Sequence, residues 1–381
     1  MTFPATPVNL TSFHRRKRFP RPTGEAGLRK HWRSAGKRLP SRMSIEWRIL
    51  GRAGADNALH VVVDSGQARE SLLFDCGEGC LDGLRASEVQ AVDHIAFSHF
   101  HMDHVSGFDG FFRQNYNRPD VPVSVWGPPE TIGRMGHRFQ SFVWNLHAGQ
   151  PGEWIVREIG PETIGSARFF TSEAFACHRQ PDRPYPVPVV HRASFWRLEA
   201  RALPHGSIPS MAYRVVESPR RNIDPVALHR CGYLPGPWLK EVVDETEGDE
   251  ADLVEVAGRA VRVGEIRQEL LVTTPGASVA WLTDFRVEPG SREWDDLVAW
   301  LRGTTTLVCE CQYRASDAAL AVKNAHMTAD LVGRLASEAG VGGLVLQHLS
   351  RRYGAGDWIA MRDEARAFFP RAELPAEWEL R

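Results

Sequence analysis

Short runs of apolar residues, in many places alternating with polar residues, dominate the chain from residue 43 onward. Alternation over about four to eight residues is typical of half-buried β-strands, and the Gly, Pro and Asp residues between the runs provide turns. The pattern therefore predicts a protein built mainly from strands. The predicted strands are Glu46–Leu50, Leu59–Val63, Ser71–Phe74, His94–Phe97, Val121–Trp126, Trp154–Glu158, Ala167–Thr171, Phe195–Ala202, Met211–Val216, Ser278–Leu282, Thr306–Cys309 and Gly343–Leu346.

Helical periodicity is clear in two segments. In Thr328–Ala339 the apolar residues Leu331 and Leu335 fall on one face, and Gly340 provides a C-terminal stop. Val105–Asn115 is the second predicted helix. Strands in series with helices on the outside predict an α/β protein, a layered sandwich made of two such halves.

The strand pattern fails in one long stretch, between Glu217 and Asp252. This stretch contains the turn-forming sequence LPGPW at residues 234–238 and ends in an acidic run. Long connections without a pattern of their own are usually functional arms or flexible linkers. We interpret residues 217–252 as an arm inserted into a single domain that spans residues 43–381.

The composition excludes several classes of protein. With 381 residues, 43% hydrophobic and 24% charged, the chain resembles ordinary globular proteins, and it has no apolar run of the roughly 18–20 residues that cross a bilayer. We therefore predict a cytoplasmic protein. The six cysteines form no CxxC pairs, which argues against a zinc ribbon or a disulfide scaffold and predicts small buried residues.

Charge is unevenly distributed along the chain. Residues 1–42 contain eleven Lys and Arg residues and one acidic residue, Glu25, so residues 43–381 are net acidic in a chain of formal net charge −1. A basic, apolar-poor segment of this kind is expected to be disordered. Two interpretations remain open: the segment is an arm that binds RNA phosphates, or translation begins at Met43.

The most informative segment for function is Ser98–His104, with the sequence SHFHMDH. It follows a predicted strand and places His99, His101, Asp103 and His104 within six residues on a loop. Neutral imidazoles and carboxylates bind zinc in sites that keep one position open for water. A lone histidine is more often an ordinary polar residue, but that interpretation does not account for four potential ligands at this spacing.

The spacing HxHxDH resembles the signature of the metallo-β-lactamase fold, an αββα sandwich of two mixed sheets flanked by helices, with metal ions at the rim between the sheets. Further motifs resemble the ribonuclease Z branch of that fold, and they occur in that family's order. They are Phe74–Gly79 (FDCGEG), Leu203–Gly206 (LPHG), Thr283–Arg286 (TDFR) and His348–Tyr353 (HLSRRY). The resemblance extends from about Leu50 to Tyr353 and implies a two-metal hydrolase.

The resemblance also implies which residues bind two Zn²⁺ ions, with Mn²⁺ or another divalent metal as the alternative. His99, His101 and His205 would bind one ion, Asp103, His104 and His348 the other, and Asp284 would bridge them. Taken singly, His205 also suits a turn, Asp284 a cap and His348 a buried hydrogen bond. Two metal ions about 3.5–4 Å apart activate a water molecule and clamp the oxygens of a phosphodiester.

Catalytic support is expected from residues near this centre. His326, at the start of the helix Thr328–Ala339, resembles the family's HST element and would stabilise phosphate or donate a proton, although it would also suit a helix cap. Glu310 matches the acidic residue that orients this histidine, and Asp103 is placed among the catalytic residues as well as the ligands. Asp75 is expected to hold the ligands through hydrogen bonds.

Contacts with the substrate are also implied by the resemblance. The family's exosite binds tRNA through a glycine-proline motif and basic residues, and its closing motif is H-x-S-x-R-Y. The matching residues are Pro235, Gly236, Pro237, Lys240, Ser350 and Arg352. The chain departs from the family pattern at Thr283, Phe285 and Met327, and its net acidic portion contrasts with the basic surface expected of a tRNA-binding enzyme.

The leading hypothesis is a zinc-dependent endoribonuclease that processes the 3′ ends of precursor tRNA and, as the resemblance implies, forms homodimers. The alternative is a phosphodiesterase for a small molecule such as a cyclic nucleotide, or another hydrolase of the same fold. A flavodi-iron oxidoreductase shares the fold, but its motif has glutamate where this chain has His101. The complete set of ligands argues against a non-catalytic RNA-binding module.

Overall fold

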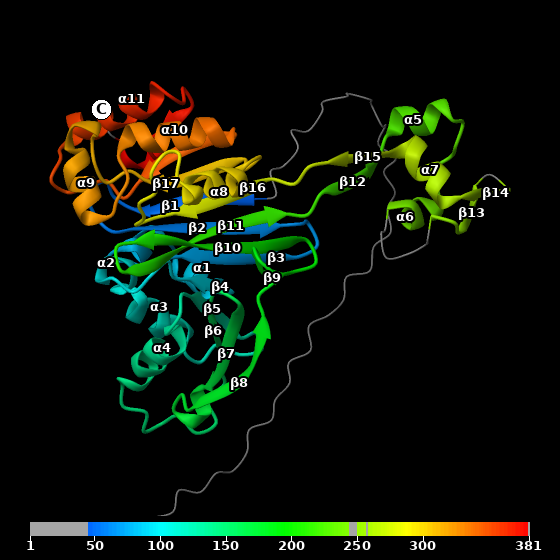
Figure 1. Ribbon diagram of the computed structural model, residues 1–381. Helices are drawn as coiled ribbons and strands as arrows, with labels where there is room; N and C mark the ends of the chain where they lie inside the picture. Colours follow the sequence, from blue (N-terminus) through cyan, green and yellow to red (C-terminus); the bar gives the residue numbers. More distant parts are fainter. Residues whose placement is uncertain (1–44, 244–249, 257, 380–381) are drawn as a thin grey trace, which may run out of the picture. The chain divides into compact units, whose positions relative to one another are not determined.

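The computed structural model describes residues 45–243, 250–256 and 258–379. The basic segment at residues 1–42 and part of the acidic run that ends the predicted arm lie outside the described residues. Two large sheets are stacked on each other, with helices on both outer sides (Figure 1).

The first sheet has eight strands in the order β1-β2-β3-β4-β5-β6-β7-β8. The pairs between β3 and β6 are parallel, and the pairs on either side of them are antiparallel. The strands are β1 (Ile45–Gly51), β2 (Asn57–Asp64), β3 (Arg69–Phe74), β4 (His94–Ala96), β5 (Val123–Gly127), β6 (Glu153–Ile159), β7 (Thr163–Phe170) and β8 (Cys177–Pro184).

The second sheet has seven strands in the order β19-β18-β17-β16-β11-β10-β9. The pairs from β16 to β19 are parallel, whereas β9, β10, β11 and β16 pair antiparallel. The strands are β9 (Val189–Arg192), β10 (Trp196–His205), β11 (Ile208–Glu217), β16 (Ser278–Leu282), β17 (Thr306–Glu310), β18 (Gly343–Gln347) and β19 (Ala372–Glu373).

The main core lies between the two sheets because alternate side chains of each strand point inward. Phe74 and Trp126 of the first sheet and Tyr213 and Trp281 of the second are buried in one apolar cluster. Helices bury a further apolar cluster on the outer face of each sheet. The helices of the sandwich are α1 (Ala86–Gln90), α2 (Met102–Val105), α3 (Phe108–Asn115), α4 (Thr131–Gln140), α8 (Arg292–Leu301), α9 (Ala318–Asn324), α10 (Ala329–Ala339) and α11 (Ala355–Arg366).

The predicted strands and the helix Thr328–Ala339 are confirmed, apart from shifts of up to four residues at their ends. Strand β8 was missed because all its residues are exposed, so it carries no apolar signal. Four of the six cysteines are buried as predicted, but Cys231 is half-buried and Cys177, in the exposed strand β8, is exposed.

The predicted helix Val105–Asn115 is wrong at its beginning, because α2 and α3 are separate helices with a break at Gly107. The Gly107 N–H donates to the carbonyl of Cys76 at 2.9 Å, and a Cβ at this position would collide with the carbonyl oxygen of Gly77. The close approach of the turn after β3 therefore interrupts the helix.

The predicted arm has secondary structure of its own and extends beyond residue 252. An antiparallel ladder closes it at Arg220 and Thr274, which are partners in register. Its apolar cluster, which includes Trp238, Val242 and Ile266, is separate from those of the sheets. The elements are β12 (Arg220–Ile223), α5 (Pro225–Arg230), α6 (Trp238–Val243), β13 (Leu253–Val256), β14 (Arg259–Arg262), α7 (Val263–Leu270) and β15 (Leu271–Thr274). These elements are too short to produce a clear periodic pattern.

None of the helices in the described ranges is both long enough and apolar enough to pass through a lipid bilayer. The cytoplasmic location expected from the sequence stays a prediction.

Candidate metal centre

Three of the predicted ligands stand at the C-terminal ends of strands. His205 is the last residue of β10, Asp284 follows β16 after one intervening residue, and His348 directly follows β18. Asp284 and His348 have positive φ angles of 49° and 53°, in the left-handed region. Because that conformation costs a non-glycine residue roughly 1–2 kcal/mol, the hydrogen bonds around each residue must offset it.

The HxHxDH segment follows β4 and is held in place by the turn after β3. The N–H of Cys76 donates to the carbonyl of His104 at 2.8 Å. Gly77 leaves room for the loop, since a Cβ there would collide with the carbonyl oxygen of Asp103. The FDCGEG motif is therefore the support on which the ligand loop rests.

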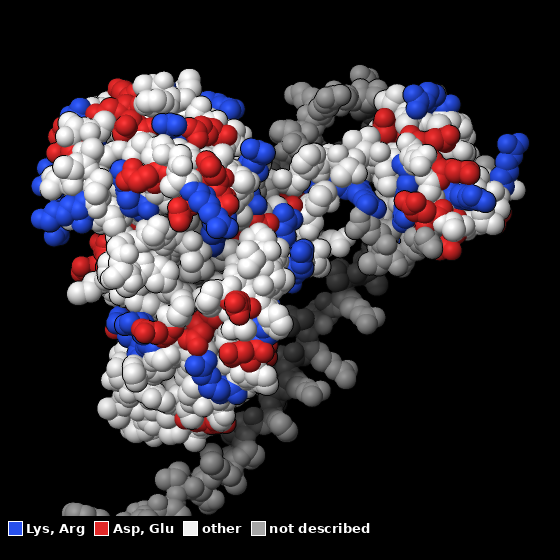
Figure 2. All heavy atoms as spheres, in the orientation of Figure 1, with Lys and Arg blue, Asp and Glu red and all other residues white. Residues whose placement is uncertain are grey.

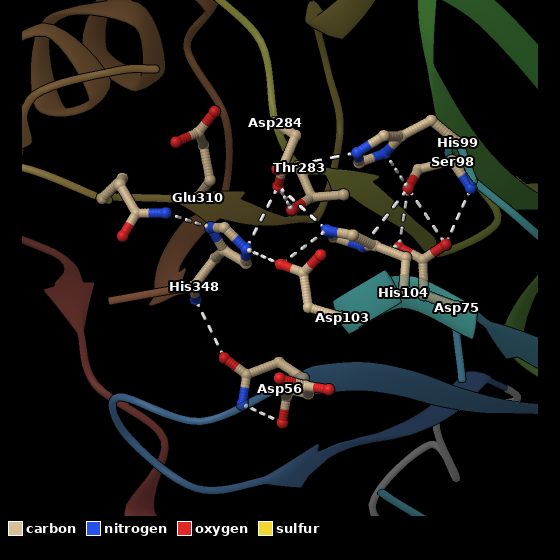
Figure 3. Close-up of polar contacts among 12 residues, drawn as sticks. Asp56, Asp75, Ser98, His99, Asp103, His104, Thr283, Asp284, Glu310 and His348 are labelled. Carbon is tan, nitrogen blue, oxygen red and sulfur yellow. Dashed lines mark hydrogen bonds and ion pairs between the residues drawn. The ribbon is translucent and has the colours of Figure 1, made fainter. Parts of the chain in front are cut away.

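The carboxylate of Asp284 lies at the middle of the site (Figure 3). Its Oδ1 is 3.3 Å from Nε2 of His104 and 3.2 Å from Nε2 of His348. Its Oδ2 is 3.8 Å from Nε2 of His99 and 3.8 Å from Nε2 of His205. Each oxygen thus faces a different pair of histidines.

The structure gathers the seven predicted ligands into two groups that share this carboxylate. In each group, one ligand atom per residue lies within 4.8 Å of the others. The groups are His99, His101, His205 and Asp284, and Asp103, His104, Asp284 and His348. Each is a set of imidazole and carboxylate donors able to hold a divalent metal ion. Their assignment as ligands stays a prediction.

The imidazole rings are oriented by partners behind them. Nδ1 of His104 is 3.0 Å from Oδ2 of Asp75, and Nδ1 of His99 is 3.0 Å from Oγ of Ser98. His205 donates from Nδ1 to the carbonyl of Ala325 at 3.0 Å. A proton on Nδ1 leaves the lone pair on Nε2, the nitrogen that faces Asp284.

Two buried nitrogens in the centre lack a hydrogen-bond partner among the described residues. They are Nε2 of His99 and Nε2 of His104. An unsatisfied buried nitrogen costs free energy unless something binds its lone pair. Because one such atom occurs in each group, the residues present fit a pair of metal ions.

Charges in the site favour a positive occupant. Burial would raise the pKa of Asp284, but His348 and His104 hold it well below its usual range. Burial would lower the pKa of His104, yet the carboxylates of Asp284 and Asp75 raise it well above the ordinary value. The carboxylates therefore stabilise positive charge at this point, and a bound cation would supply it in place of a proton.

Asp75 has the supporting role that the sequence predicted. It is buried, and besides His104 it accepts the N–H of Ser98 at 2.7 Å and the indole N–H of Trp281 at 3.1 Å. Its φ of 58° is in the left-handed region. One carboxylate thus fixes the ligand loop and one ligand ring to the inner core.

Glu310 and His326 form a pair next to the centre. Glu310, the last residue of β17, is buried, and its Oε2 accepts from Nδ1 of His326 at 2.9 Å. Its Oε1 accepts the backbone N–H of Phe285 at 2.6 Å. Burial alone would lower the pKa of His326, but the Glu310 carboxylate raises it to about 9. The pairing with Glu310 therefore favours the protonated form of His326.

Two of the three departures from the family pattern point away from this chemistry. Phe285 and Met327 are fully buried in the apolar cluster between the second sheet and its helices. Their backbone N–H groups, in contrast, both donate to Glu310. These two side chains therefore fill the core. The third departure, Thr283, differs, because its Oγ1 donates to Oδ1 of Asp284 at 2.7 Å.

The predicted substrate residues lie in two places. Oγ of Ser350 accepts the N–H of Arg352 at 3.4 Å, just after His348, and the Arg352 guanidinium lies 5.9 Å from the centroid of the Tyr313 ring. The other four, Pro235, Gly236, Pro237 and Lys240, belong to the arm. A Cβ at Gly236 would lie 2.9 Å from the Trp238 ring, so a larger residue in this turn would require that ring to shift. Their contact with substrate stays a prediction.

Several residues of the site were missed from the sequence. Asn57 accepts the backbone N–H of His348 at 3.0 Å, and the Gln312 amide lies 3.0 Å from Nδ1 of His348. Ser98 and Trp281, which bind Asp75, were also missed. Only Ser98 had a signal, its place beside the HxHxDH motif; the others are distant in sequence.

No protein-family model matches the chain. Ribonuclease Z from Deinococcus radiodurans is 40% identical over 332 residues, which cover 87% of this chain and 97% of that protein. Ribonuclease Z from Kineococcus radiotolerans is 31% identical over 300 residues, 78% of this chain and 79% of that protein. The chain belongs to the ribonuclease Z family.

Membership of the ribonuclease Z family confirms the hydrolase class and the fold expected from the motifs. The two mixed sheets with flanking helices are the metallo-β-lactamase sandwich. Among solved structures, the metallo-β-lactamase fold protein YhfI from Bacillus subtilis is similar, with 16% identity, a TM-score of 0.49, and coverage of 87% of this chain and 95% of that one.

The position of Asp75 behind His104 generates a prediction for metal binding. Asp75→Asn keeps the shape of the side chain but replaces the carboxylate, which contacts Ser98, His104 and Trp281, by a neutral amide. We expect zinc affinity to fall roughly 10- to 100-fold, measured by competition with a chromogenic chelator. The exposed Asp82→Asn is the matched control and should bind zinc as the wild type does. Equal affinity in both variants would show that Asp75 does not position the ligand.

Proposed function

We propose that this chain is a zinc-dependent endoribonuclease that processes the 3′ ends of precursor tRNA. The observation that carries the proposal is the Asp284 carboxylate, whose two oxygens face different groups of ligand atoms, 3.2–3.8 Å from four histidine nitrogens. This is the arrangement that a two-metal phosphodiesterase requires. The relatives named ribonuclease Z extend over most of the chain and support RNA as the substrate.

Zinc is the proposed metal because five imidazoles and two carboxylates form the site. Mn²⁺ or another divalent ion is the alternative. When bound, two such ions supply a more acidic water and positive charge opposite the phosphoryl oxygens.

The residues of the chain have separate tasks in the proposed reaction. His99, His101 and His205 hold one side of the centre, Asp103, His104 and His348 hold the other, and Asp284 joins them. Asp75 keeps His104 in the orientation that presents Nε2.

Proton transfer is assigned to His326. Its ring lies 5.6 Å from the ring of His348 and 5.0 Å from that of His205, so it borders both groups. The Glu310 carboxylate raises the pKa of His326 to about 9, which favours an imidazolium that can stabilise a phosphoryl oxygen or protonate the leaving oxygen. Glu310 orients this ring and is itself fixed by the N–H of Phe285.

The arm and the surface of the sandwich are proposed to contribute to binding of precursor tRNA. On the face shown in Figure 2, basic and acidic side chains are interspersed and do not form one continuous basic surface. Acidic residues also outnumber basic ones in 220–274. The contribution of the arm therefore rests on the exposed Pro235–Pro237 turn and Lys240, which would position tRNA by local contacts.

We also propose that the active protein is a homodimer.

Cleavage of a precursor tRNA is the direct test. The zinc-loaded protein should cut it to a mature 3′ end with a free hydroxyl, read from the length and chemistry of the product on a sequencing gel. Removal of metal with a chelator should abolish cleavage, and added zinc should restore it. Intact RNA after incubation with protein shown to contain two zinc ions would refute the proposed substrate while leaving the metal centre standing.

His326→Ala tests the proposed proton donor. We expect kcat for precursor tRNA to fall roughly 10²- to 10⁴-fold with little change in KM, because the charge acts on the reacting phosphate. Bound zinc should remain at the wild-type level. His178→Ala, which removes an exposed histidine from β8, is the control and should retain kcat. A loss in KM alone would assign His326 to binding instead of chemistry.

Excision of the arm separates the two candidate substrate classes. Arg220 and Thr274 are partners in an antiparallel ladder, about 5 Å apart, so a two-residue turn can replace residues 221–273. We expect kcat/KM for precursor tRNA to fall roughly 10- to 100-fold, with hydrolysis of bis(p-nitrophenyl) phosphate unchanged. Retention of full tRNA activity would indicate that the arm has no part in binding. If tRNA were never a substrate and a small phosphodiester were, the phosphodiesterase alternative would replace the proposal.

A further inference from the structure

A second polar region lies at the surface of the sandwich, where side chains of β5, β6, β8 and β9 come together. His94 is the first residue of β4, whereas the ligand loop follows the other end of that strand. A cavity of about 380 Å³ lies close to His94, whose ring contacts the rings of Trp126 and His191 in the cavity lining. Its lining includes Trp126, Arg157, Arg183, Val190, His191 and Arg192.

The cavity is lined by arginines that lack an acidic partner. Across residues 45–243, 250–256 and 258–379, no carboxylate forms an ion pair with Arg157, Arg183 or Arg192. Two other arginines of the same sheet differ, because Arg168 pairs with Glu153 at 2.6 Å and Arg179 with Glu158 at 3.0 Å. Unbalanced positive charge is thus a property of the cavity and not of the sheet.

Arg157 is the central cation of this group. It is half-buried, its guanidinium lies 4.5 Å from the centroid of the Trp126 ring, and it donates to Oγ of Ser124 at 3.2 Å. Burial and the nearby Arg183 lower the pKa of Arg157 to about 10, so it remains charged at neutral pH. A half-buried cation beside a like charge is costly unless an anion accompanies it.

The neighbouring acid does not supply that anion. Glu70 lies 3.5 Å from Nε2 of His94, and it is not part of the lining of the cavity. Arg183 is fixed by a different group, because it donates to the carbonyl of Val190. The guanidinium groups of Arg157 and Arg183 therefore keep N–H donors that can meet a ligand in the cavity.

Glu70, His94 and His191 are close enough to one another to resemble a metal site, but hydrogen bonding argues against a metal ion there. The indole N–H of Trp126 donates to Nδ1 of His94 at 3.2 Å. Neutral His94 must then carry its proton on Nε2, the nitrogen that faces Glu70. That nitrogen has no lone pair for a metal, so the region is suited to an anion instead.

We propose that this cavity binds a small phosphate monoester, at a site separate from the metal centre. Arginine guanidinium groups match phosphate oxygens with paired N–H donors, and a dianion balances more of the local charge than a carboxylate does. The volume of about 380 Å³ is in the range of small-ligand pockets, roughly 300–1,000 Å³. Trp126 and Val190 provide apolar walls for the organic part of the ligand.

Binding of uridine 5′-monophosphate to the zinc-loaded protein tests the proposal by calorimetry. Because the metal centre also attracts phosphate, the measurement uses crossed variants. His104→Ala should lose binding at the centre and keep the cavity site, and Arg157→Gln should weaken the cavity site at least tenfold. Arg183→Gln, at an exposed position, provides the same test without changing a half-buried residue. The control is Arg168→Gln, on the same sheet outside the cavity.

The expected result is a binding event in His104→Ala that both cavity variants weaken and Arg168→Gln leaves unchanged. Inorganic phosphate should compete for it, and acetate should not. The proposal is overturned if His104→Ala binds no nucleotide at concentrations on the order of 10 mM, or if Arg157→Gln and Arg183→Gln bind as tightly as the control. Competition by acetate equal to that by phosphate would also overturn the assignment to phosphate monoesters.

Discussion

The centre of this protein depends on a single buried carboxylate that serves two groups of histidines at once. Asp284 is almost completely buried, and its two oxygens face different pairs of histidine nitrogens. A buried negative charge is stable only when compensated, and the surrounding imidazoles or bound cations provide that compensation. Each other feature of the site either delivers a histidine to this carboxylate or keeps the carboxylate in place.

The sandwich meets this requirement by bringing strand ends together. His205, Asp284 and His348 leave three strands of the second sheet, and the HxHxDH loop leaves β4 of the first. The chain turns sharply after two of these strands, and Asp284 and His348 adopt the strained left-handed backbone conformation there. Because ligands arrive from both sheets, the centre forms only when the inner core between the sheets is packed.

Much of this could be predicted from the sequence, and the exceptions have physical causes. The HxHxDH loop is local, so its spacing alone predicts convergence, and alternation identified strands that have one buried face. The contacts of His348 with Asn57 and Gln312 could not be predicted, because they join residues far apart in the chain. Strand β8 and the far boundary of the arm gave no apolar signal. The sequence indicated that the substitutions at Phe285 and Met327 alter the site, but the fold buries both side chains in the core.

Glu310 connects the backbone next to the bridging carboxylate with the proposed proton donor, His326. One of its oxygens holds the backbone beside Asp284, and the other holds the ring of His326. A shift of the Glu310 side chain would therefore act on the backbone next to Asp284 and on the His326 ring together, so the spacing of the two groups depends on one side chain and not on two independent anchors.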